Sequence, residues 1–178
     1  MTHTIDSSHS LIEFSVKHMM VSTVKGRFTK FSGDVEIDEA NPANSKVDVV
    51  IDATSITTSD EKRDGHLRSA DFFESEKYPE ITFHSTKVEA LGGETYRVTG
   101  DLTLHGVTRP ITFDISRGGK TTNMQGKDLQ GFSATLTLSR KDFGLEWNVA
   151  LESGGWLVSD HVKIALEVEV VSAATVAA

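Results

Sequence analysis

The stretch Leu11-Ile12-Glu13-Phe14-Ser15-Val16-Lys17-His18 places apolar side chains on one parity and polar side chains on the other, with His18 ending the apolar row. This two-residue period is typical of a β-strand with one buried face and one wet face. The same alternation recurs along the chain and predicts about eight strands, at residues 12–18, 31–38, 46–52, 80–84, 96–104, 111–115, 132–138 and 162–170.

Strands that are half wet are typical of antiparallel sheets, because buried parallel strands are apolar on both parities. The pattern fits either a two-sheet sandwich or a closed barrel. Glycines inside the strands favour the barrel, since they often mark bends and bulges. Turn signals separate the strands, at Asn41-Pro42, Gly92-Gly93, His105-Gly106, Gly118-Gly119 and Gly154-Gly155.

One segment departs from the alternation. Residues 58–73 mix acidic and basic side chains and end in Phe72-Phe73, and they predict a helix from about Asp60 to Ser69. A barrel has open ends that such an insert can cover. We therefore expect an all-β fold, an eight-stranded antiparallel barrel with a short helical insert capping one end. The period does not distinguish a packed lumen from a hollow one.

The composition is that of a globular domain, with 178 residues, 38% hydrophobic and 25% charged. The formal net charge of -8 and the lack of a basic cluster argue against nucleic acid as a partner. The chain has no cysteine, which excludes disulfides and thiolate chemistry. No apolar run is long enough for a membrane-spanning helix, so we expect no stable membrane insertion.

The usual catalytic and metal-binding motifs are absent from the sequence, and no metal or cofactor is expected. Four polar residues remain as candidates. His18 ends an apolar row and is either a hydrogen-bonded core histidine or a polar contact for a ligand. Arg63 and His66 lie on the helical insert and either fix it by local ion pairs or meet a ligand head group. Arg140 continues an inward row, which predicts a rim position and a salt bridge to Asp142 or to a helix carboxylate.

Six groups of motifs, in order, then resemble the YceI-like polyisoprenoid-binding family over nearly the whole chain. They are residues 9–18, Gly26-Arg27-Phe28 with Phe31-Ser32-Gly33, Ser55-Ile56-Thr57-Thr58, Arg63-Asp64-Gly65-His66-Leu67 with 71–73 and 78–83, residues 100–109, and Arg140-Lys141-Asp142-Phe143-Gly144-Leu145.

The resemblance implies a lipocalin-like barrel that binds, transports or stores a long-chain polyisoprenoid lipid, such as a polyprenyl phosphate or a quinone precursor, without catalysis. The polar end of the ligand is then expected at His18, Arg63, His66 and Arg140. The inward rows and the insert are expected to hold the lipid tail, at Phe14, Val16, Phe28, Phe31, Val35, Ile51, Leu67, Phe72, Phe73, Phe83, Leu104, Phe113 and Leu136.

Two rival functions stay open. One is a barrel-fold hydrolase or isomerase that acts on an isoprenoid or other apolar substrate through His18, His66 or Arg63. The other is a packed β-domain that binds another protein. We expect one domain at residues 1–171 and a short tail at 172–178, with a homodimer left open. The N-terminus has no signal peptide, which predicts a cytoplasmic protein, or a periplasmic one if a leader has been removed.

Overall fold

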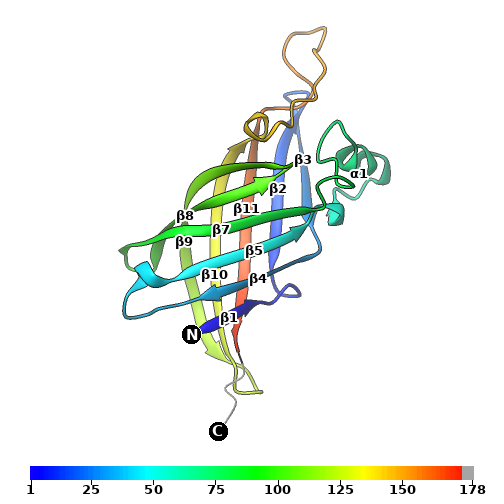
Figure 1. Cartoon of the computed structure of the whole chain (residues 1–178). Coiled ribbons are helices and arrows are strands. Elements are labelled where there is room, and N and C mark those ends of the chain that lie inside the picture. Colours follow the sequence, from blue (N-terminus) through cyan, green and yellow to red (C-terminus); the bar gives the residue numbers. More distant parts are fainter. Residues whose placement is uncertain (174–178) are drawn as a thin grey trace.

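The computed structural model describes residues 1–173, which form one antiparallel sheet of eleven strands (Figure 1). Eight of these strands close into a ring in the order β1-β4-β5-β7-β8-β9-β10-β11, because β11 also pairs with β1. The predicted eight-stranded barrel is confirmed. The strands are β1 (Thr2–Ile5), β2 (Leu11–His18), β3 (Ser22–Phe28), β4 (Phe31–Glu36), β5 (Lys46–Asp52), β6 (Ile56–Thr57), β7 (Glu80–Gly92), β8 (Thr95–Leu104), β9 (Val107–Thr122), β10 (Asp128–Ser139) and β11 (His161–Ser172).

The long strand β11 pairs with β10 along one edge, and the two halves of its other edge have different partners. Its C-terminal residues pair with β1, whereas Lys163 to Glu167 pair with β2. The strands β2, β3 and β6 continue the wall at this end of the molecule. The domain predicted from the sequence ends at residue 171, but strand β11 includes Ser172, which pairs with His3. Residues 174–178 of the predicted tail lie outside the described residues.

Three strands escape the alternation analysis. β1 is only four residues long, and its inward residues are the buried His3 and the half-buried Ile5. β3 carries Gly26 at the position where the ring of Phe14 lies, so its inward row is incomplete in the sequence. β6 has two residues. The predicted turn at Gly118-Gly119 is wrong, because both glycines lie within β9, where they form a bulge opposite Gly131 of β10.

The helical insert is α1 (Glu61–Arg68), close to the predicted bounds, and lies beside β3 in Figure 1. The carboxylate of Asp60 accepts a hydrogen bond from the backbone N–H of Arg63, which is an N-cap. A helix of eight residues has little stability of its own in water, so its packing on the barrel maintains it. Three single-turn 3-10 helices complete the fold: η1 (Pro42–Asn44), η2 (Ala53–Ser55) and η3 (Arg140–Phe143).

Candidate functional site

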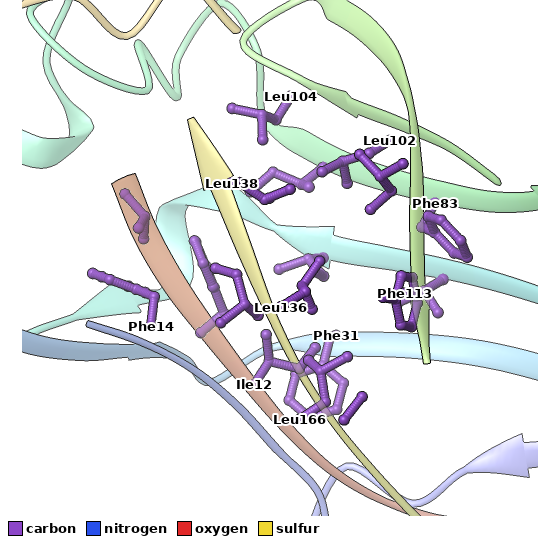
Figure 2. Close-up of a pocket in the computed structure, with 18 of the residues that line it drawn as sticks. Ile12, Phe14, Phe31, Phe83, Leu102, Leu104, Phe113, Leu136, Leu138 and Leu166 are labelled. Carbon is purple, nitrogen blue, oxygen red and sulfur yellow. The ribbon is translucent and has the colours of Figure 1, made fainter. Parts of the chain in front are cut away.

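The barrel is hollow. One cavity of about 480 Å³ runs along its inside, and its wall is made of the inward rows of the strands. Figure 2 shows ten labelled apolar side chains that converge on this space, from Ile12 and Phe14 to Phe83 and Phe113. A volume of this size lies within the range of roughly 300–1,000 Å³ that small-molecule sites occupy. The packed lumen left open by the sequence is therefore not what the structure contains.

All seventeen residues predicted as ligand contacts line this cavity. That these side chains contact a ligand stays a prediction. Further inward residues complete the wall and were not selected from the sequence, although they continue the same alternating rows. They include Ile12, Ile81, Leu102, Ile111, Ile115, Leu138, Val162, Ile164, Leu166 and Val168.

At the helix end of the cavity, Arg63 is exposed and also lines the wall, so it lies at an opening. Its guanidinium donates from Nε to the hydroxyl of Thr58 at 2.8 Å and from Nη2 to the Thr58 carbonyl at 3.0 Å. Among residues 1–173, no carboxylate lies within ion-pair distance of Arg63. The local ion pair predicted for Arg63 is therefore wrong, whereas His66 does pair with a nearby carboxylate, that of Asp71. The positive charge of Arg63 is held in place by neutral oxygen atoms.

His66 lies beside Arg63 on α1 and is half-buried. Its Nε2 lies 2.8 Å from a carboxylate oxygen of Asp71. Its ring packs edge-on against Phe72 and Trp147, with centroid distances of 5.1 and 4.6 Å. These contacts fix the imidazole at the cavity wall. His18 completes this end from β2, where its backbone pairs with Val158.

Arg140 has a structural role, but its partners differ from those predicted. It is 5% exposed, and its guanidinium donates to the backbone carbonyls of Leu145, Trp147, Val158 and Ser159, at 2.6 to 3.4 Å. Burial lowers the pKa of this guanidinium. The predicted salt bridge to Asp142 or a helix carboxylate is wrong, because the chain returns at residues 145–159 and surrounds the side chain with carbonyl groups. Arg140 anchors that returning segment.

The far end of the cavity has a second arginine. Arg117 on β9 donates from Nε to Glu94 at 2.6 Å and from Nη1 to Glu39 at 2.8 Å, and it lies over the ring of Tyr96. Arg117, Glu39 and Tyr96 all line the cavity. The strand β5 runs from this end to η2 and the insert, so the two arginines lie at opposite ends of the cavity. Sequence reasoning missed Arg117, because its partners lie 23 and 78 residues away in the chain.

Outside the barrel, Asp6, His9 and Glu169 place one ligand atom each within 4.8 Å of the others. The His9 Nδ1 is 2.9 Å from Asp6 Oδ2, and this hydrogen bond lowers the pKa of Asp6 to about 2. The internal hydrogen bond accounts for the arrangement without an ion. Among residues 1–173, no helix is both long and apolar enough to cross a bilayer.

A family model for the YceI-like domain matches residues 3–170. A UPF0312 protein of Vibrio parahaemolyticus is 47% identical over 138 residues, which cover 78% of this chain and 73% of that protein. A UPF0312 protein of Staphylococcus aureus is 39% identical over 167 residues, 93% of this chain and 95% of that protein.

Solved structures share the fold. BcnA of Burkholderia cenocepacia superposes with a TM-score of 0.80 at 27% identity, covering 93% of this chain and 98% of that chain. The Campylobacter jejuni YceI protein gives 0.74 at 35% identity, covering 88% and 90%. A polyisoprenoid-binding domain from Saccharophagus degradans gives 0.69 at 21% identity, covering 96% and 98%, a likeness of fold. With a family model that spans nearly all of the sequence, the chain belongs to the YceI-like family.

Proposed function

We propose that this protein is a non-catalytic carrier or store for a long-chain polyisoprenoid lipid, held with its tail along the inside of the barrel. The observation that carries the proposal is the cavity inside the barrel, which has apolar walls along its length and polar side chains gathered at its two ends. A polyprenyl tail has no polar atoms, so it needs apolar surface and length rather than precise hydrogen bonds.

The energetics suit reversible binding. Burial of apolar surface contributes roughly 25 cal/mol per Å², whereas ordering a flexible tail and losing its free movement offset much of that gain. Membership of the YceI-like family supports the proposal, and the S. degradans polyisoprenoid-binding domain has the same fold.

The charges at the two ends favour one orientation of the ligand. At the far end, the charge of Arg117 is neutralised by Glu39 and Glu94. At the helix end, the guanidinium of Arg63 is hydrogen-bonded only to the oxygen atoms of Thr58 in the described residues. An anionic head group such as a phosphate therefore gains more at the helix end, next to Arg63 and His66, because no carboxylate in the described residues is directly paired with the guanidinium of Arg63.

The rival to this proposal is an enzyme that uses His66. The Nε2 atom of His66 is paired with Asp71, but among residues 1–173 no hydroxyl or carboxylate is hydrogen-bonded to the other ring nitrogen of His66. The His66–Asp71 pair therefore has no adjacent nucleophile of the kind that hydrolases use. Turnover of a polyprenyl ester that is lost in His66→Ala, with lipid binding retained, would replace our proposal with the rival.

The direct test is native mass spectrometry of protein purified without detergent, followed by organic extraction and by titration with a polyprenyl phosphate. We expect a co-purifying or saturably bound isoprenoid lipid at one molecule per chain. If no lipid co-purifies and added polyprenyl phosphate does not bind, the proposal is wrong.

A matched pair of substitutions tests where the tail lies. Phe113 is partly buried and faces the cavity, whereas its neighbour Thr112 is exposed on the outer face of β9. Phe113→Asp puts a carboxylate into an apolar space, where it must be desolvated or protonated, and should abolish lipid uptake. Thr112→Asp adds the same group outside and should leave uptake unchanged. Circular-dichroism melts of both variants confirm that they are folded.

A second pair tests the head-group end. Arg63→Ala should weaken binding of a polyprenyl phosphate about tenfold or more and leave binding of the uncharged polyprenol nearly unchanged, since a charge-assisted hydrogen bond is lost. Lys62→Ala removes the same charge from the neighbouring residue, which does not line the cavity, and should affect neither ligand. Equal loss for phosphate and alcohol in Arg63→Ala would make Arg63 a structural residue.

A further inference from the structure

Large apolar side chains are exposed together at one end of the molecule. Among the described residues, nine large hydrophobic side chains are exposed, and five of these belong to two adjoining segments. Met19, Met20 and Val21 form the turn between β2 and β3, and Val149 and Trp156 belong to the loop that follows η3. Their exposed fractions run from 46% to 85%, and Trp156 is 56% exposed. We call these five residues the apolar tip.

The two segments form one structure. The backbone N–H of Met19 donates to the carbonyl of Leu157 at 2.8 Å, and the N–H of Leu157 donates to Val149 at 2.9 Å. Ala150 and Trp156 form a β-bridge, and the sulfur of Met20 fills the space beside Gly155. Figure 1 shows the loop after η3 projecting beyond the barrel, on the end that carries α1.

The base of the loop is fixed. The side-chain amide of Asn148 donates to the carbonyl of Val158 at 2.7 Å and accepts from the N–H of Val158 at 3.0 Å. Arg140 donates to the carbonyls of Trp147 and Val158 on the two sides of the loop. A loop tied at its base in this way presents its apolar end in a defined position.

The turn itself is built at a conformational cost. Met19 and Met20 have φ values of +52° and +61°, in the left-handed region that glycine and asparagine adopt more readily. The N–H of Val21 donates to the carbonyl of His18 at 3.1 Å, so Met19 and Met20 are the two central residues of a β-turn. Turns with positive φ at both central residues strongly prefer Asn-Gly. Methionine here is unfavourable for the turn and for solubility, which points to a use for the exposed side chains.

The tip is continuous with the cavity. The loop after η3 contributes Trp147, Leu157 and Val158 to the cavity wall, beside Arg63 and His66 at the helix end. His18, the residue of β2 that directly precedes the turn, also lines the cavity. An apolar surface that leads from the outside of the molecule to the polar opening of a lipid cavity lies where a lipid would enter and leave.

We propose that the apolar tip inserts into the surface of a lipid bilayer and so places the helix end of the cavity where lipid can be exchanged. The lipid-exchange part of this inference rests on the proposed function. Tryptophan suits the bilayer interface because its ring is apolar and its N–H is polar. The tip is a projection rather than a groove, and five side chains expose a few hundred Å², less than the roughly 800 Å² that each partner buries in a stable protein complex. The net charge of -8 and the exposed Glu152 in the loop favour a neutral lipid surface over an anionic one.

The two tryptophans of the chain allow a direct test. Trp147→Phe leaves Trp156 as the reporter of the tip, and Trp156→Phe leaves Trp147 as a reporter within the cavity wall. With phosphatidylcholine vesicles, we expect the emission of Trp156 to shift to shorter wavelength and to be quenched by lipids brominated near the head group. Emission of Trp147 should not be quenched by these lipids. If the emission of Trp156 is the same with and without saturating vesicles, the proposal is wrong.

A tip variant separates vesicle binding from lipid binding. The triple variant Met20→Asn, Val21→Thr, Trp156→Ser should keep the turn, since asparagine readily adopts the left-handed backbone conformation of Met20. We expect co-sedimentation with phosphatidylcholine vesicles and the rate of polyprenyl phosphate uptake from them to fall at least tenfold. Uptake from detergent solution should be unchanged. Met124→Ser is the control, because Met124 is fully exposed in the turn between β9 and β10, away from the tip.

The remaining outcomes are also decisive. If neither protein binds polyprenyl phosphate from detergent, the proposed function fails, whereas the vesicle experiments still judge the tip by itself. If the unmodified protein is a dimer in analytical ultracentrifugation and the triple variant is a monomer, the tip is a protein interface and the bilayer proposal is wrong. Equal or stronger binding to vesicles rich in phosphatidylglycerol at low salt would contradict the neutral surface.

Discussion

The carboxylate of Asp64 accepts two hydrogen bonds from Thr58, one from the backbone N–H at 2.8 Å and one from the hydroxyl at 2.5 Å. Asp64 is 5% exposed, and the hydroxyl of the same Thr58 accepts a hydrogen bond from the guanidinium of Arg63. One short network thus joins the end of β6 to α1 and holds Arg63 at the cavity opening.

Removing this carboxylate should loosen the insert. We expect Asp64→Ala to lower the free energy of unfolding by about 2–3 kcal/mol, because two buried donors of Thr58 lose a charged acceptor. Urea denaturation measures this effect. Glu61→Ala, an exposed carboxylate on the same helix, should change stability by less than about 0.5 kcal/mol. Equal effects from the two variants would show that the network does not stabilise the insert.

A second prediction concerns Arg140 and the loop that it anchors. Lysine keeps the charge but has one nitrogen, which cannot reach carbonyl groups on both sides of the loop. We expect Arg140→Lys to lower the free energy of unfolding by at least about 2 kcal/mol and to make residues 145–158 sensitive to proteolysis. Limited proteolysis with mass spectrometry checks the second effect. The control is Arg97→Lys, since Arg97 is an exposed arginine paired with Asp114, and it should change neither property. An Arg140→Lys protein as resistant as the parent would contradict the anchoring role.

The strands of the wall could be predicted because alternate residues of an antiparallel barrel strand face the inside and the outside, and they are apolar and polar accordingly. β10 is an example, where Phe132, Ala134 and Leu136 face the cavity. The same rule failed at β3, where Gly26 makes room for Phe14, because the inward residue there is recognised only with its neighbour in view.

The apolar wall of the candidate site could be predicted from the sequence more fully than the roles of its arginines. The apolar wall follows from the strands, but its hollowness does not, because packed and empty lumens have the same period. The roles of Arg140 and Arg117 depend on groups that the fold brings from distant parts of the chain. No local pattern distinguishes either arginine from one at a ligand contact.

Gly100 offers a test of the cavity wall. A Cβ atom there would lie 2.5 Å from both the ring of Phe83 and the carbonyl of His84, so the backbone and the ring must move. We expect Gly100→Ala to lower stability by about 1–3 kcal/mol and to reduce lipid uptake by displacing Phe83 into the cavity. Gly119 in β9 has open space around it, and Gly119→Ala should be neutral or slightly stabilising. Thermal melts of the two variants decide the matter, and similar melting temperatures would refute this account of Gly100.

The pair Asp6 and His9 predicts a defined pH dependence. The hydrogen bond from His9 is the largest cause that lowers the pKa of Asp6 to about 2, and the hydrogen bond with Asp6 raises the pKa of His9 above its usual 6.5. A lowered carboxylate pKa stabilises the fold above about pH 4, and this contribution is lost as the pH falls toward 2. A raised histidine pKa stabilises the fold below about pH 6.5, and this contribution is lost as the pH rises through the folded-state pKa.

The pair should therefore contribute most between about pH 4 and 6.5. We expect the difference in unfolding free energy between the parent and His9→Ala to be largest near the middle of this window and to shrink at both pH 3 and pH 9. Chemical denaturation at the three pH values measures the difference, and an NMR titration of the His9 ring gives its pKa directly. His161→Ala, which removes an exposed histidine that has no carboxylate in ion-pair distance among residues 1–173, should show no such maximum. A His9 ring that titrates at its ordinary pKa would mean that the hydrogen bond with Asp6 does not persist in solution.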